Sequence, residues 1–380
     1  MFITTRTADV AIVGAGILGV AHAYALAKRG RSVVVFERSP QAAGASVRNF
    51  GMIWPIGQPA GCMHDMALRS RELWLEALAA ARLPYFPTGS LHVVYRHDEA
   101  CVAREFCDVA PKLGYQCGWL NPDEVVARSR AVRPEGLLGA IWSPTEITVD
   151  PRPALTHLPW FLTEEFGVRF HMGVSVHSID LPSVEVGGEN WQVQAAIVCT
   201  GDDFESLYPE VFHDSGVTRC KLQMLRTRPQ PEGWQLGPAL AAGLTLRFYE
   251  SFQVCRTLRA LKERIAAETP EYDRWGIHVL VSQTARREVT IGDSHEYGAA
   301  VDPFDRAEID DLILSYARGF LQAPDLETAW RWHGVYAKHP DKPFVSLSPA
   351  PDVRVVTATG GSGMTLSFDL AEQTVREMGF

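Results

Sequence analysis

Apolar and polar positions at the start of the chain predict a strand, a glycine-rich turn and a helix. Residues 9–13 form a short apolar run that leads directly into the glycines of 14–19. Apolar residues then recur at helical spacing as far as Ala27, and Gly30 ends the pattern. The run 32–36 is nearly all valine, which is typical of a strand buried on both faces. Together these segments predict one βαβ unit of about 30 residues.

A second strand–turn–helix pattern closes the chain, and alternating segments fill the middle. Residues 352–358 predict a strand that runs through a glycine-rich turn into a helix over 365–378. The mixed alternation of 218–228, 245–250 and 275–283 predicts an antiparallel sheet. We expect further helices over 63–81, 100–113, 122–128, 153–165 and 306–321, and further strands over 91–95, 169–171, 174–179, 191–193 and 195–200.

This order of elements predicts an α/β fold with two interleaved domains. We expect a Rossmann-type dinucleotide-binding domain with a central, mostly parallel sheet, built from residues 1–81, 148–217 and 328–380. We expect an α+β second domain, which binds the substrate and is built on a large antiparallel sheet, from residues 82–147 and 218–327. The length agrees with two domains, because 380 residues exceed what one small core usually holds.

Composition and charge exclude several classes of function. The net charge of −9 disfavours nucleic-acid binding. No apolar run approaches the roughly 18–20 residues of a membrane-spanning helix, so we expect no membrane insertion. The apolar stretch 10–20 contains three glycines, and no cleavage-type pattern follows it. We therefore expect a cytoplasmic protein without a secretory signal.

The cysteines and histidines show no disulfide or metal-binding pattern. Seven cysteines are scattered along the chain without a C-x-x-C pair, and their odd number argues against a disulfide framework. The histidines lack the ligand spacing of an H-E-x-x-H motif. We therefore expect reduced thiols and no metal ion.

The glycines after the first strand favour dinucleotide binding. Gly14 permits the tight turn, Gly16 lets the backbone approach a pyrophosphate, and Gly19 lets helix and strand pack closely. The helix N-terminus offers unpaired N–H groups and a positive dipole end to the phosphates. Glu37 lies 18 residues after Gly19, where it could accept hydrogen bonds from both ribose hydroxyls, and its charge disfavours NADP. The alternative is an accidental glycine-rich turn.

Two further segments favour FAD over NAD. The polar loop 44–53 could supply hydroxyl, amide and N–H groups to the second phosphate and the flavin ring. The turn 359–365 would place a helix N-terminus near the flavin C2 carbonyl and N1, where negative charge accumulates on reduction. Each segment by itself could also be an ordinary loop.

With these motifs the chain resembles, nearly end to end, the FAD-dependent amine oxidases of the glycine oxidase, sarcosine oxidase and D-amino acid oxidase type. Some sarcosine oxidases attach their flavin through a cysteine near the C-terminal region. The last cysteine of this chain is Cys255, so we expect noncovalent FAD. The positions that the resemblance assigns to FAD binding are Gly14, Gly16, Ile17, Leu18, Gly19, Glu37, Arg38, Ala45, Ser46, Asn49, Phe50, Gly51, Met52, Val176, Thr200, Gly201, Gly361, Ser362, Gly363, Met364 and Thr365.

Three segments, 48–55, 291–297 and 363–368, resemble more specifically the oxidases associated with aminophosphonate breakdown. This resemblance implies oxidation of an amine related to 2-aminoethylphosphonate. Amino-acid oxidases usually carry an arginine for the substrate carboxylate where this chain has Tyr336, which puts an α-amino acid substrate in doubt. A locally basic stretch could bind a tetrahedral phosphonate instead, or it could be a solvated loop. Its members are Arg331, His333, Lys338, His339 and Lys342.

The family resemblance also implies the reaction. A hydride passes from the α-carbon of the neutral amine to flavin N5, the imine hydrolyses, and O2 reoxidises the flavin to give H2O2. No dedicated base is required, so the catalytic residues stay unassigned, with His278 and Tyr336 as weak candidates; a protonated His278 could supply a cation for oxygen activation. Trp54 could equally belong to the core, and Arg247 and Tyr249 to the surface of a strand. The residues that we expect at the substrate are Trp54, Arg247, Tyr249, His333, Tyr336 and Lys338.

Two other functions stay open at this point. The same fold could serve an amine or D-amino acid dehydrogenase that passes electrons to a quinone or a carrier protein. It could also serve a non-enzymatic FAD-binding module.

Overall fold

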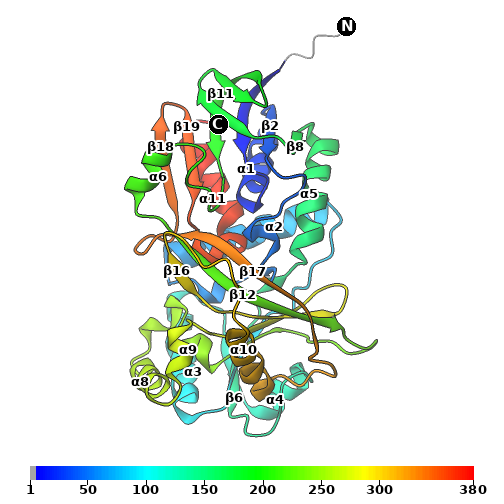
Figure 1. Ribbon diagram of the computed structural model, residues 1–380. Helices are drawn as coiled ribbons and strands as arrows, with labels where there is room; N and C mark the ends of the chain where they lie inside the picture. The colour runs from blue at the N-terminus through cyan, green and yellow to red at the C-terminus, as the bar shows by residue number, and fades with distance from the viewer. Residues whose placement is uncertain (1–5) are drawn as a thin grey trace.

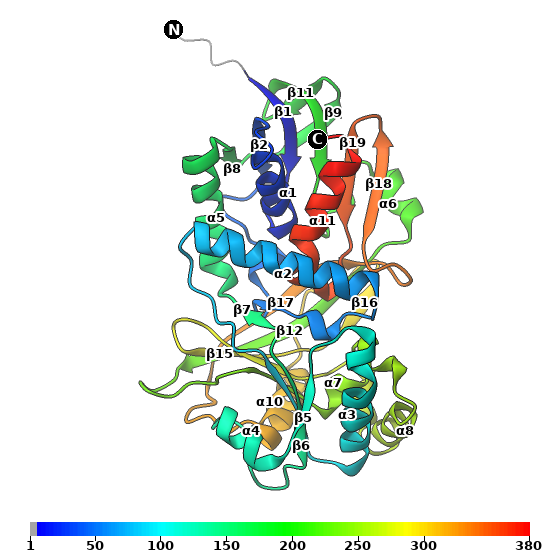
Figure 2. The same ribbon diagram turned by 180° about the vertical axis from the view of Figure 1, so that it is seen from behind.

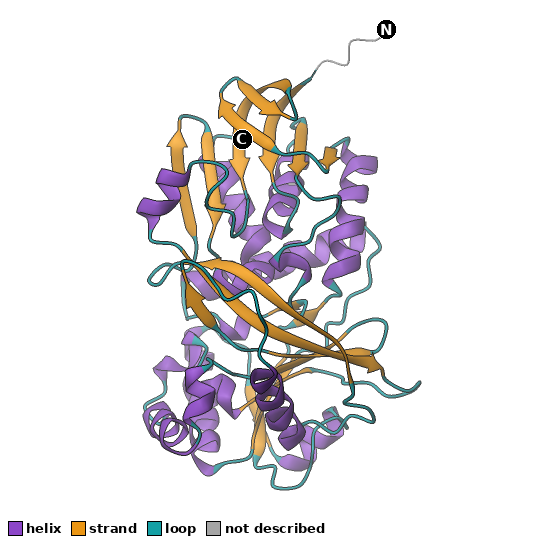
Figure 3. Cartoon of the chain, in the orientation of Figure 1, coloured by secondary structure: helices purple, strands orange, loops and turns teal. Residues whose placement is uncertain are grey.

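The computed structural model describes residues 6–380, and two large β-sheets, one above the other in Figure 1, dominate it. The first five residues of the predicted dinucleotide-binding domain lie outside the described range. Figure 3 shows the two blocks of strands, each with helices packed around it. The chain crosses between the blocks several times, as the interleaved pattern of the sequence predicts.

The upper sheet is mostly parallel. Strand β1 pairs in parallel with β2 on one side and with β11 on the other. Along β1, Val10 and Ile12 pack into the apolar cluster on one face, whereas Ala11 and Val13 pack into the cluster on the other. Burial on both faces explains why these strands read as unbroken apolar runs. The path of the sheet is β18 (Val345–Ala350), β19 (Val353–Thr357), β11 (Glu189–Val198), β1 (Thr7–Val13), β2 (Val33–Glu37) and β8 (Arg169–Met172), with β9 (Val176–Asp180) and β10 (Ser183–Val186) attached through β11.

Helices cover one face of the upper sheet, and the β9–β10 hairpin lies against the other. Figure 2 shows the helical face, where α2 crosses below α1 and α11. Trp74 of α2 is fully buried there, and its indole N–H donates a hydrogen bond to the carbonyl of Met364 at the start of α11 (2.7 Å). The helices around this sheet are α1 (Ile17–Ala27), α2 (Cys62–Ala80), α5 (Pro151–Phe166), α6 (Pro209–Ser215) and α11 (Gly363–Glu377).

The lower sheet is mostly antiparallel, with the one parallel pairing among its described strands between β13 and β4. Its faces are covered by α10 on one side and by α3 and α8 on the other. The path of the sheet is β16 (Glu296–Gly298), β12 (Thr218–Pro229), β15 (Glu288–Gly292), β14 (Leu280–Gln283), β13 (Ala239–Ala242), β4 (Ser90–Val94), β6 (Gly139–Ser143) and β5 (Gly118–Leu120), with β17 (Thr328–Lys338) paired to β12. The helices of this half are α3 (His97–Val109), α4 (Pro122–Arg128), α7 (Gly243–Leu246), α8 (Leu258–Glu268), α9 (Pro270–Arg274) and α10 (Ala307–Phe320).

Two short pairings join the halves. Strand β3 (Met52–Ile53) pairs with β7 (Ile147–Thr148) in a small sheet of its own. The last residue of β17, Lys338, forms an isolated antiparallel bridge with Thr359, which stands just before the C-terminal helix of the upper half. The long strand of the lower sheet is thus tied to the upper half at its end.

The predicted fold class is confirmed, but some elements differ from the sequence prediction. Residues 245–250 are not a strand, because the short helix α7 (Gly243–Leu246) and a 3-10 helix from Glu250 occupy this segment. Only Leu280–Gln283 of the predicted strand 275–283 is extended in the sheet, and the predicted strands 191–193 and 195–200 merge into the single strand β11, which ends at Val198. Residues 328–338 pair in the lower sheet, so we propose that they belong to the second domain rather than to the first.

No helix within residues 6–380 combines the length and apolar character that crossing a bilayer requires. All seven cysteines are free thiols in the structure.

Candidate active site

A cavity of about 950 Å³ lies between the two halves. One end lies at the carboxyl ends of β1 and β2, beside Glu37 and Val176. The other end lies against the lower sheet, beside His278 and Asp293. Ligands of open parallel sheets bind at these carboxyl ends, so the position of the cavity fits a nucleotide cofactor.

The first glycine turn leaves no room for side chains. Gly14 has φ +102°, and a Cβ on it would lie 2.4 Å from the carbonyl oxygen of Cys199. A Cβ on Gly19 would lie 1.8 Å from the carbonyl oxygen of Gly14. Helix α1 then starts with Gly16 as its N-cap, a residue that has no side chain to cap the helix N–H groups. The turn therefore presents bare backbone and a helix N-terminus to the cavity, which suits a pyrophosphate.

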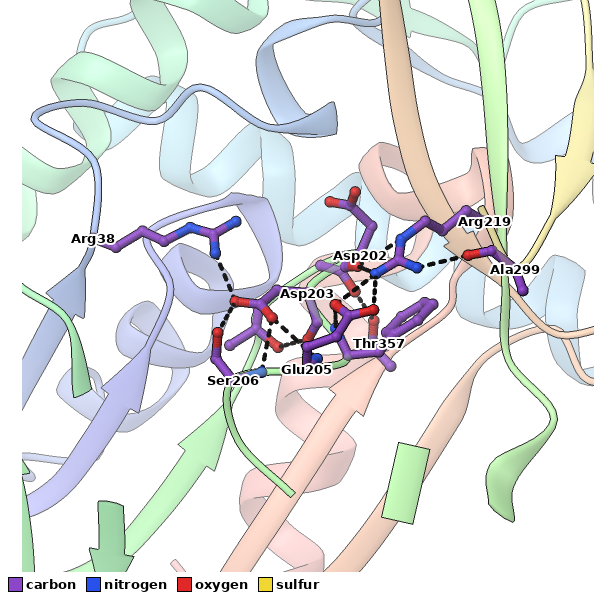
Figure 4. A network of polar contacts seen from close by, with 11 residues as sticks. Arg38, Asp202, Asp203, Glu205, Ser206, Arg219, Ala299 and Thr357 are labelled. Atoms are coloured by element: carbon purple, nitrogen blue, oxygen red, sulfur yellow. Dashed lines mark hydrogen bonds and ion pairs between the residues drawn. The ribbon is translucent and has the colours of Figure 1, made fainter. Parts of the chain in front are cut away.

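Glu37 is held at the end of β2 by the backbone around it. Its Oε2 accepts a hydrogen bond from Ala15 N–H (2.9 Å) and its Oε1 accepts one from Ser39 N–H (2.9 Å). The neighbouring Arg38 turns away to pair with Asp203 (2.6 Å), as Figure 4 shows. The carboxylate is thus fixed in the cavity wall with lone pairs free for ribose hydroxyls.

Replacing Glu37 with glutamine tests this position. Hydrogen bonds to charged groups contribute about 1.5–3 kcal/mol each, so we expect FAD affinity to fall about tenfold to a hundredfold. The measurement is titration of the apoprotein with FAD. Glu185→Gln, on the exposed strand β10, is the matched control and should leave the affinity unchanged. An unchanged affinity in Glu37→Gln would remove Glu37 from the site.

The loop after β2 is ordered by its own side chains. Ser46 Oγ accepts a hydrogen bond from Ile17 N–H (2.9 Å), which joins the loop to the start of α1. Asn49 donates to the carbonyl of Ala45 (2.9 Å) and accepts from Gly51 N–H (2.7 Å). Its amide therefore fixes the bend that carries Phe50 into the cavity wall.

The C-terminal turn meets this loop across the cavity. Ser362 accepts a hydrogen bond from the Gln58 amide (3.0 Å), and the Thr365 hydroxyl accepts one from Trp54 N–H (2.9 Å). Helix α11 begins at Gly363 without a side-chain cap, and Gly363 lines the cavity. The free N–H groups of the helix therefore lie at the cavity end that holds Tyr336. The phenol oxygen of Tyr336 lies 3.7 Å from the position that a Cβ on Gly361 would take.

Most positions predicted to bind FAD line the cavity, and four stand just behind it. Gly19 and Gly51 let chain segments approach closely, since a Cβ on Gly51 would lie 1.8 Å from the Val149 carbonyl oxygen. Met52 is buried in β3, and Thr365 holds the backbone of Trp54. The cavity-lining members of the predicted set are Gly14, Gly16, Ile17, Leu18, Glu37, Arg38, Ala45, Ser46, Asn49, Phe50, Val176, Thr200, Gly201, Gly361, Ser362, Gly363 and Met364.

The residues predicted at the substrate divide into two groups. Tyr249, Tyr336 and Lys338 line the lower end of the cavity. The Lys338 ammonium lies 4.9 Å from the centre of the Tyr297 ring and takes part in no ion pair among residues 6–380.

The other three do not line the cavity. Trp54 is buried behind Tyr249, 6.4 Å between ring centres, so it is a core residue. Arg247 follows helix α7 instead of lying on a strand, and its guanidinium bonds to the Ile277 carbonyl and to Asp273 (3.1 Å each). His333 points to Asp305, 2.9 Å from its Nδ1.

Two lower-end residues, Asp293 and His295, were missed by the sequence prediction. Both line the cavity, and they lie beside His278, whose ring stacks on Phe248 at 3.8 Å. Burial lowers the pKa of His278 well below its usual value, so the hypothesis of a protonated His278 that activates oxygen finds no support. The only feature of the sequence that pointed to these two residues was the segment 291–297, and its motif by itself indicates no chemical role for them.

These three side chains also have a spacing that metal ions use, since one ligand atom of each lies within 4.8 Å of the others. Burial lowers the pKa of His295 to about 4, and the charges of two nearby cations, Lys338 and Arg247, lower it further. Their charge disfavours a divalent ion at this place. The absence of a metal stays a prediction.

The turn at the end of β11 joins the two halves beside the cofactor end. Arg219 of β12 donates to the Asp202 carbonyl, pairs with Glu205 (2.7 Å) and donates to the Ala299 carbonyl (Figure 4). Asp203 in the same turn accepts from the Ser206 hydroxyl. The cofactor end of the cavity is thus bordered by a polar network that reaches from the lower sheet to the upper one.

Comparison with protein families decides which cofactor the cavity serves. A family profile described as FAD dependent oxidoreductase matches residues 9–376. The chain belongs to the FAD dependent oxidoreductase family. FAD is the cofactor of this family, and the N-termini of helices α1 and α11, the side-chain-free turn at Gly14 and the Glu37 carboxylate fit its phosphates and ribose.

Two curated relatives show how far the likeness of this FAD dependent oxidoreductase extends. The bifunctional protein ThiO/ThiG of Nostoc sp. is 24% identical over 375 residues, which cover 95% of this chain and 51% of that protein. The glycine oxidase of Geobacillus kaustophilus is 28% identical over 210 residues, which cover 52% of this chain and 55% of the relative. The chain therefore spans about half the length of the curated relatives that it matches.

Solved structures share the fold along the whole chain. The crystal structure of the Geobacillus kaustophilus glycine oxidase superimposes with a TM-score of 0.77 at 19% identity, covering 98% of this chain and 95% of that one. L-Proline dehydrogenase from P. horikoshii gives a TM-score of 0.74 at 18% identity, covering 99% and 94%. At these identities the likeness establishes the architecture of the FAD dependent oxidoreductase and no more.

Proposed function

We propose that the protein oxidises the C–N bond of a small amine that carries an anionic group, most specifically an aminophosphonate related to 2-aminoethylphosphonate, with O2 as the final electron acceptor. The observation that carries the proposal is Lys338, a cation in the cavity wall that has no acidic partner among the described residues. A buried or half-buried charge without a partner is costly, so an anion of the ligand is its natural counterion.

Both arginines that line the cavity are engaged with the protein, since Arg38 pairs with Asp203 (2.6 Å) and Arg48 donates to the His333 carbonyl (3.2 Å). Arg38 and Arg48 both belong to the segment around the predicted flavin loop. A planar carboxylate is best held by a bidentate guanidinium, whereas a tetrahedral phosphonate accepts single donors from several directions. Lys338, Tyr336 and Tyr249 are donors of this kind, which supports a phosphonate over an α-amino acid.

Bound noncovalently, as we propose, FAD would supply the two-electron acceptor for the C–N oxidation. The protein holds the amine and excludes water. Phe248, Tyr249 and Leu280 give the lower end an apolar wall, which would keep the reacting carbon away from solvent. The predicted cytoplasmic location stays a prediction.

A dehydrogenase is the second candidate, because L-proline dehydrogenase from P. horikoshii shares this fold. The deciding experiment is an oxygen-electrode screen of the purified holoenzyme with glycine, sarcosine, D-alanine, 2-aminoethylphosphonate and its N-methyl form. We expect oxygen uptake with peroxide release for a phosphonate. Turnover of glycine or D-alanine without phosphonate activity would overturn the substrate class. Anaerobic bleaching of the flavin by the amine without oxygen uptake would favour the dehydrogenase.

Replacing Lys338 with methionine tests the anion site directly. Loss of a charge-assisted contact should raise KM for the phosphonate about tenfold or more, with a smaller effect on kcat. Lys112→Met, at an exposed lysine that does not line the cavity, is the control and should change KM little. Equal KM values in the two variants would exclude Lys338 from the site.

A further inference from the structure

Asp293 is a buried carboxyl group in the wall of the cavity. It follows strand β15 and is 5% exposed. Its backbone pairs with that of His278 through two hydrogen bonds, Asp293 N–H to the His278 carbonyl (2.8 Å) and His278 N–H to the Asp293 carbonyl (3.2 Å). The side chain is therefore fixed beside two imidazoles, with His278 Nε2 3.3 Å from Oδ1 and His295 Nε2 4.0 Å from Oδ2.

The neighbouring histidines do not neutralise this carboxyl group. His295 Nδ1 lies 3.0 Å from the Gly276 carbonyl oxygen and must carry its proton there, so in the neutral ring the Nε2 lone pair faces Asp293. Burial lowers the pKa of His295 to about 4 and that of His278 well below its usual value. No hydrogen bond reaches Asp293 Oδ1 or His278 Nδ1 in the structure. The carboxyl group thus has two uncharged imidazoles beside it and an oxygen atom without a donor.

The other groups that face Asp293 are also uncharged near neutral pH. They are Tyr249, Tyr297 and Tyr336, whose phenol pKa values burial raises, and Cys220, whose thiol pKa burial raises to about 12. Arg247, whose charge acts on both imidazoles, is tied to Asp273, a residue that does not line the cavity. Within residues 6–380, no lysine or arginine forms an ion pair with Asp293. The carboxylate is thus not paired with a protein cation, although the charge of Lys338 in the cavity wall acts on the adjacent His295 imidazole.

We propose that Asp293 binds the ammonium group of the substrate and removes one of its protons, which rests on the amine oxidation proposed above. In this step an N–H bond of the ammonium group breaks and an O–H bond forms on the carboxylate. The products are a carboxylic acid and a neutral amine. Loss of hydride from the adjacent carbon requires the nitrogen lone pair, so the proton must leave first.

Asp293 and Lys338 together would recognise a zwitterion. The ammonium end of the ligand pairs with the carboxylate, and its phosphonate or carboxylate end pairs with the lysine. Burial raises the pKa of Asp293 well above its usual value, and such a carboxyl group is a stronger base than one in water. Because its pKa is raised, the Asp293 carboxylate is protonated at a higher pH than an ordinary aspartate would be. As the pH falls through this pKa, the protonated Asp293 should lose its attraction for the ammonium ion.

Two isosteric pairs of non-oxidisable ligands test the assignment by calorimetric binding to the holoenzyme. The phosphonate pair is 2-amino-2-methylpropylphosphonate and 2,2-dimethylpropylphosphonate; the carboxylate pair is 2-aminoisobutyrate and pivalate. Within each pair the ammonium group is replaced by a methyl group, and the amino member has no hydrogen on the carbon that bears nitrogen. We expect the wild type to prefer an amino member, and Asp293→Asn to lose this preference at least tenfold while binding the methyl member equally well.

Asp310→Asn is the matched control, because Asp310 is similarly buried in the same half but pairs with Gln223 and Arg331 away from the cavity. Its preference should stay that of the wild type. If Asp293→Asn does not fold with FAD, the wild type alone decides. Its affinity for the amino member must fall with decreasing pH while its affinity for the methyl member does not.

The outcomes separate this proposal from the proposed substrate class. An Asp293-dependent preference in the carboxylate pair alone retains the role of Asp293 and overturns the aminophosphonate. Three results would overturn the role of Asp293. The first is a preference for the amino member that survives in Asp293→Asn, and the second is that neither amino member binds to the wild type. The third is a preference that disappears with a chelator and returns with Zn²⁺. The last result would assign a metal ion to the three side chains.

Discussion

Replacing Gly14 with alanine is expected to yield a protein that purifies without FAD. The new Cβ would lie 2.4 Å from the Cys199 carbonyl oxygen, so the end of β11 would have to move. The residue would also have to adopt φ +102°, which a side chain disfavours. Both penalties fall on the turn that meets the pyrophosphate, and we expect FAD affinity to fall about a hundredfold or more. Visible absorbance of the purified protein and titration with FAD measure the effect.

Gly30→Ala provides the comparison for this result. Gly30 also has a positive φ of +72°, but no atom lies within 4 Å of the position of its Cβ and it stands outside the cavity. We expect it to cost some stability and to retain FAD. If both variants kept their flavin, the close approach at Gly14 would not matter for the cofactor.

Replacing Trp74 with alanine should produce the largest loss of stability. The indole is fully buried between α2 and α11, 4.7 Å from the ring of Phe368 between centres. Its removal leaves a cavity and an unpaired Met364 carbonyl, for which large-to-small substitutions suggest about 3–5 kcal/mol. Chemical unfolding followed by far-ultraviolet circular dichroism measures it. Trp160→Ala, at a tryptophan that is 64% exposed, should change the midpoint little.

The sequence predicts the upper half well because its strands are buried on both faces. A strand buried on both faces gives an unbroken apolar run, such as 32–36, which is easy to recognise in the sequence. The strands at the two ends of the chain also lead into a glycine-rich turn followed by a helix. The lower half is harder. Residues 239–246 are buried throughout, so no alternation distinguishes strand β13 from helix α7. Strand β17 stands next to the C-terminal unit in sequence but pairs with β12, and only three-dimensional pairing assigns it to the lower sheet.

The two ends of the candidate site also differ in how well the sequence predicts them. The cofactor end depends on local motifs, in which turn, helix start and acidic residue follow at fixed spacing, so the residues could be named from sequence. The substrate end depends on residues from separate strands. Asp293 meets His278 only because β14 and β15 pair as a hairpin, and no spacing rule connects the two positions. Arg247 was misplaced for the related reason that a helix stands where a strand was expected.

Strand β17 has a consequence for which molecules the enzyme can accept. Its end at Lys338 is bridged to Thr359, and its pairing with β12 places it in the same sheet as the strand that leads to Asp293. The separation between the two charges is therefore set by backbone hydrogen bonds rather than by mobile side-chain arms alone. The site therefore selects ligands by the distance between their two charged groups. Homologous amines with one or two extra methylene groups between nitrogen and anion would have to adopt a bent conformation to pair with both Asp293 and Lys338. Chain length, more than bulk, should decide which members of a ligand series are turned over.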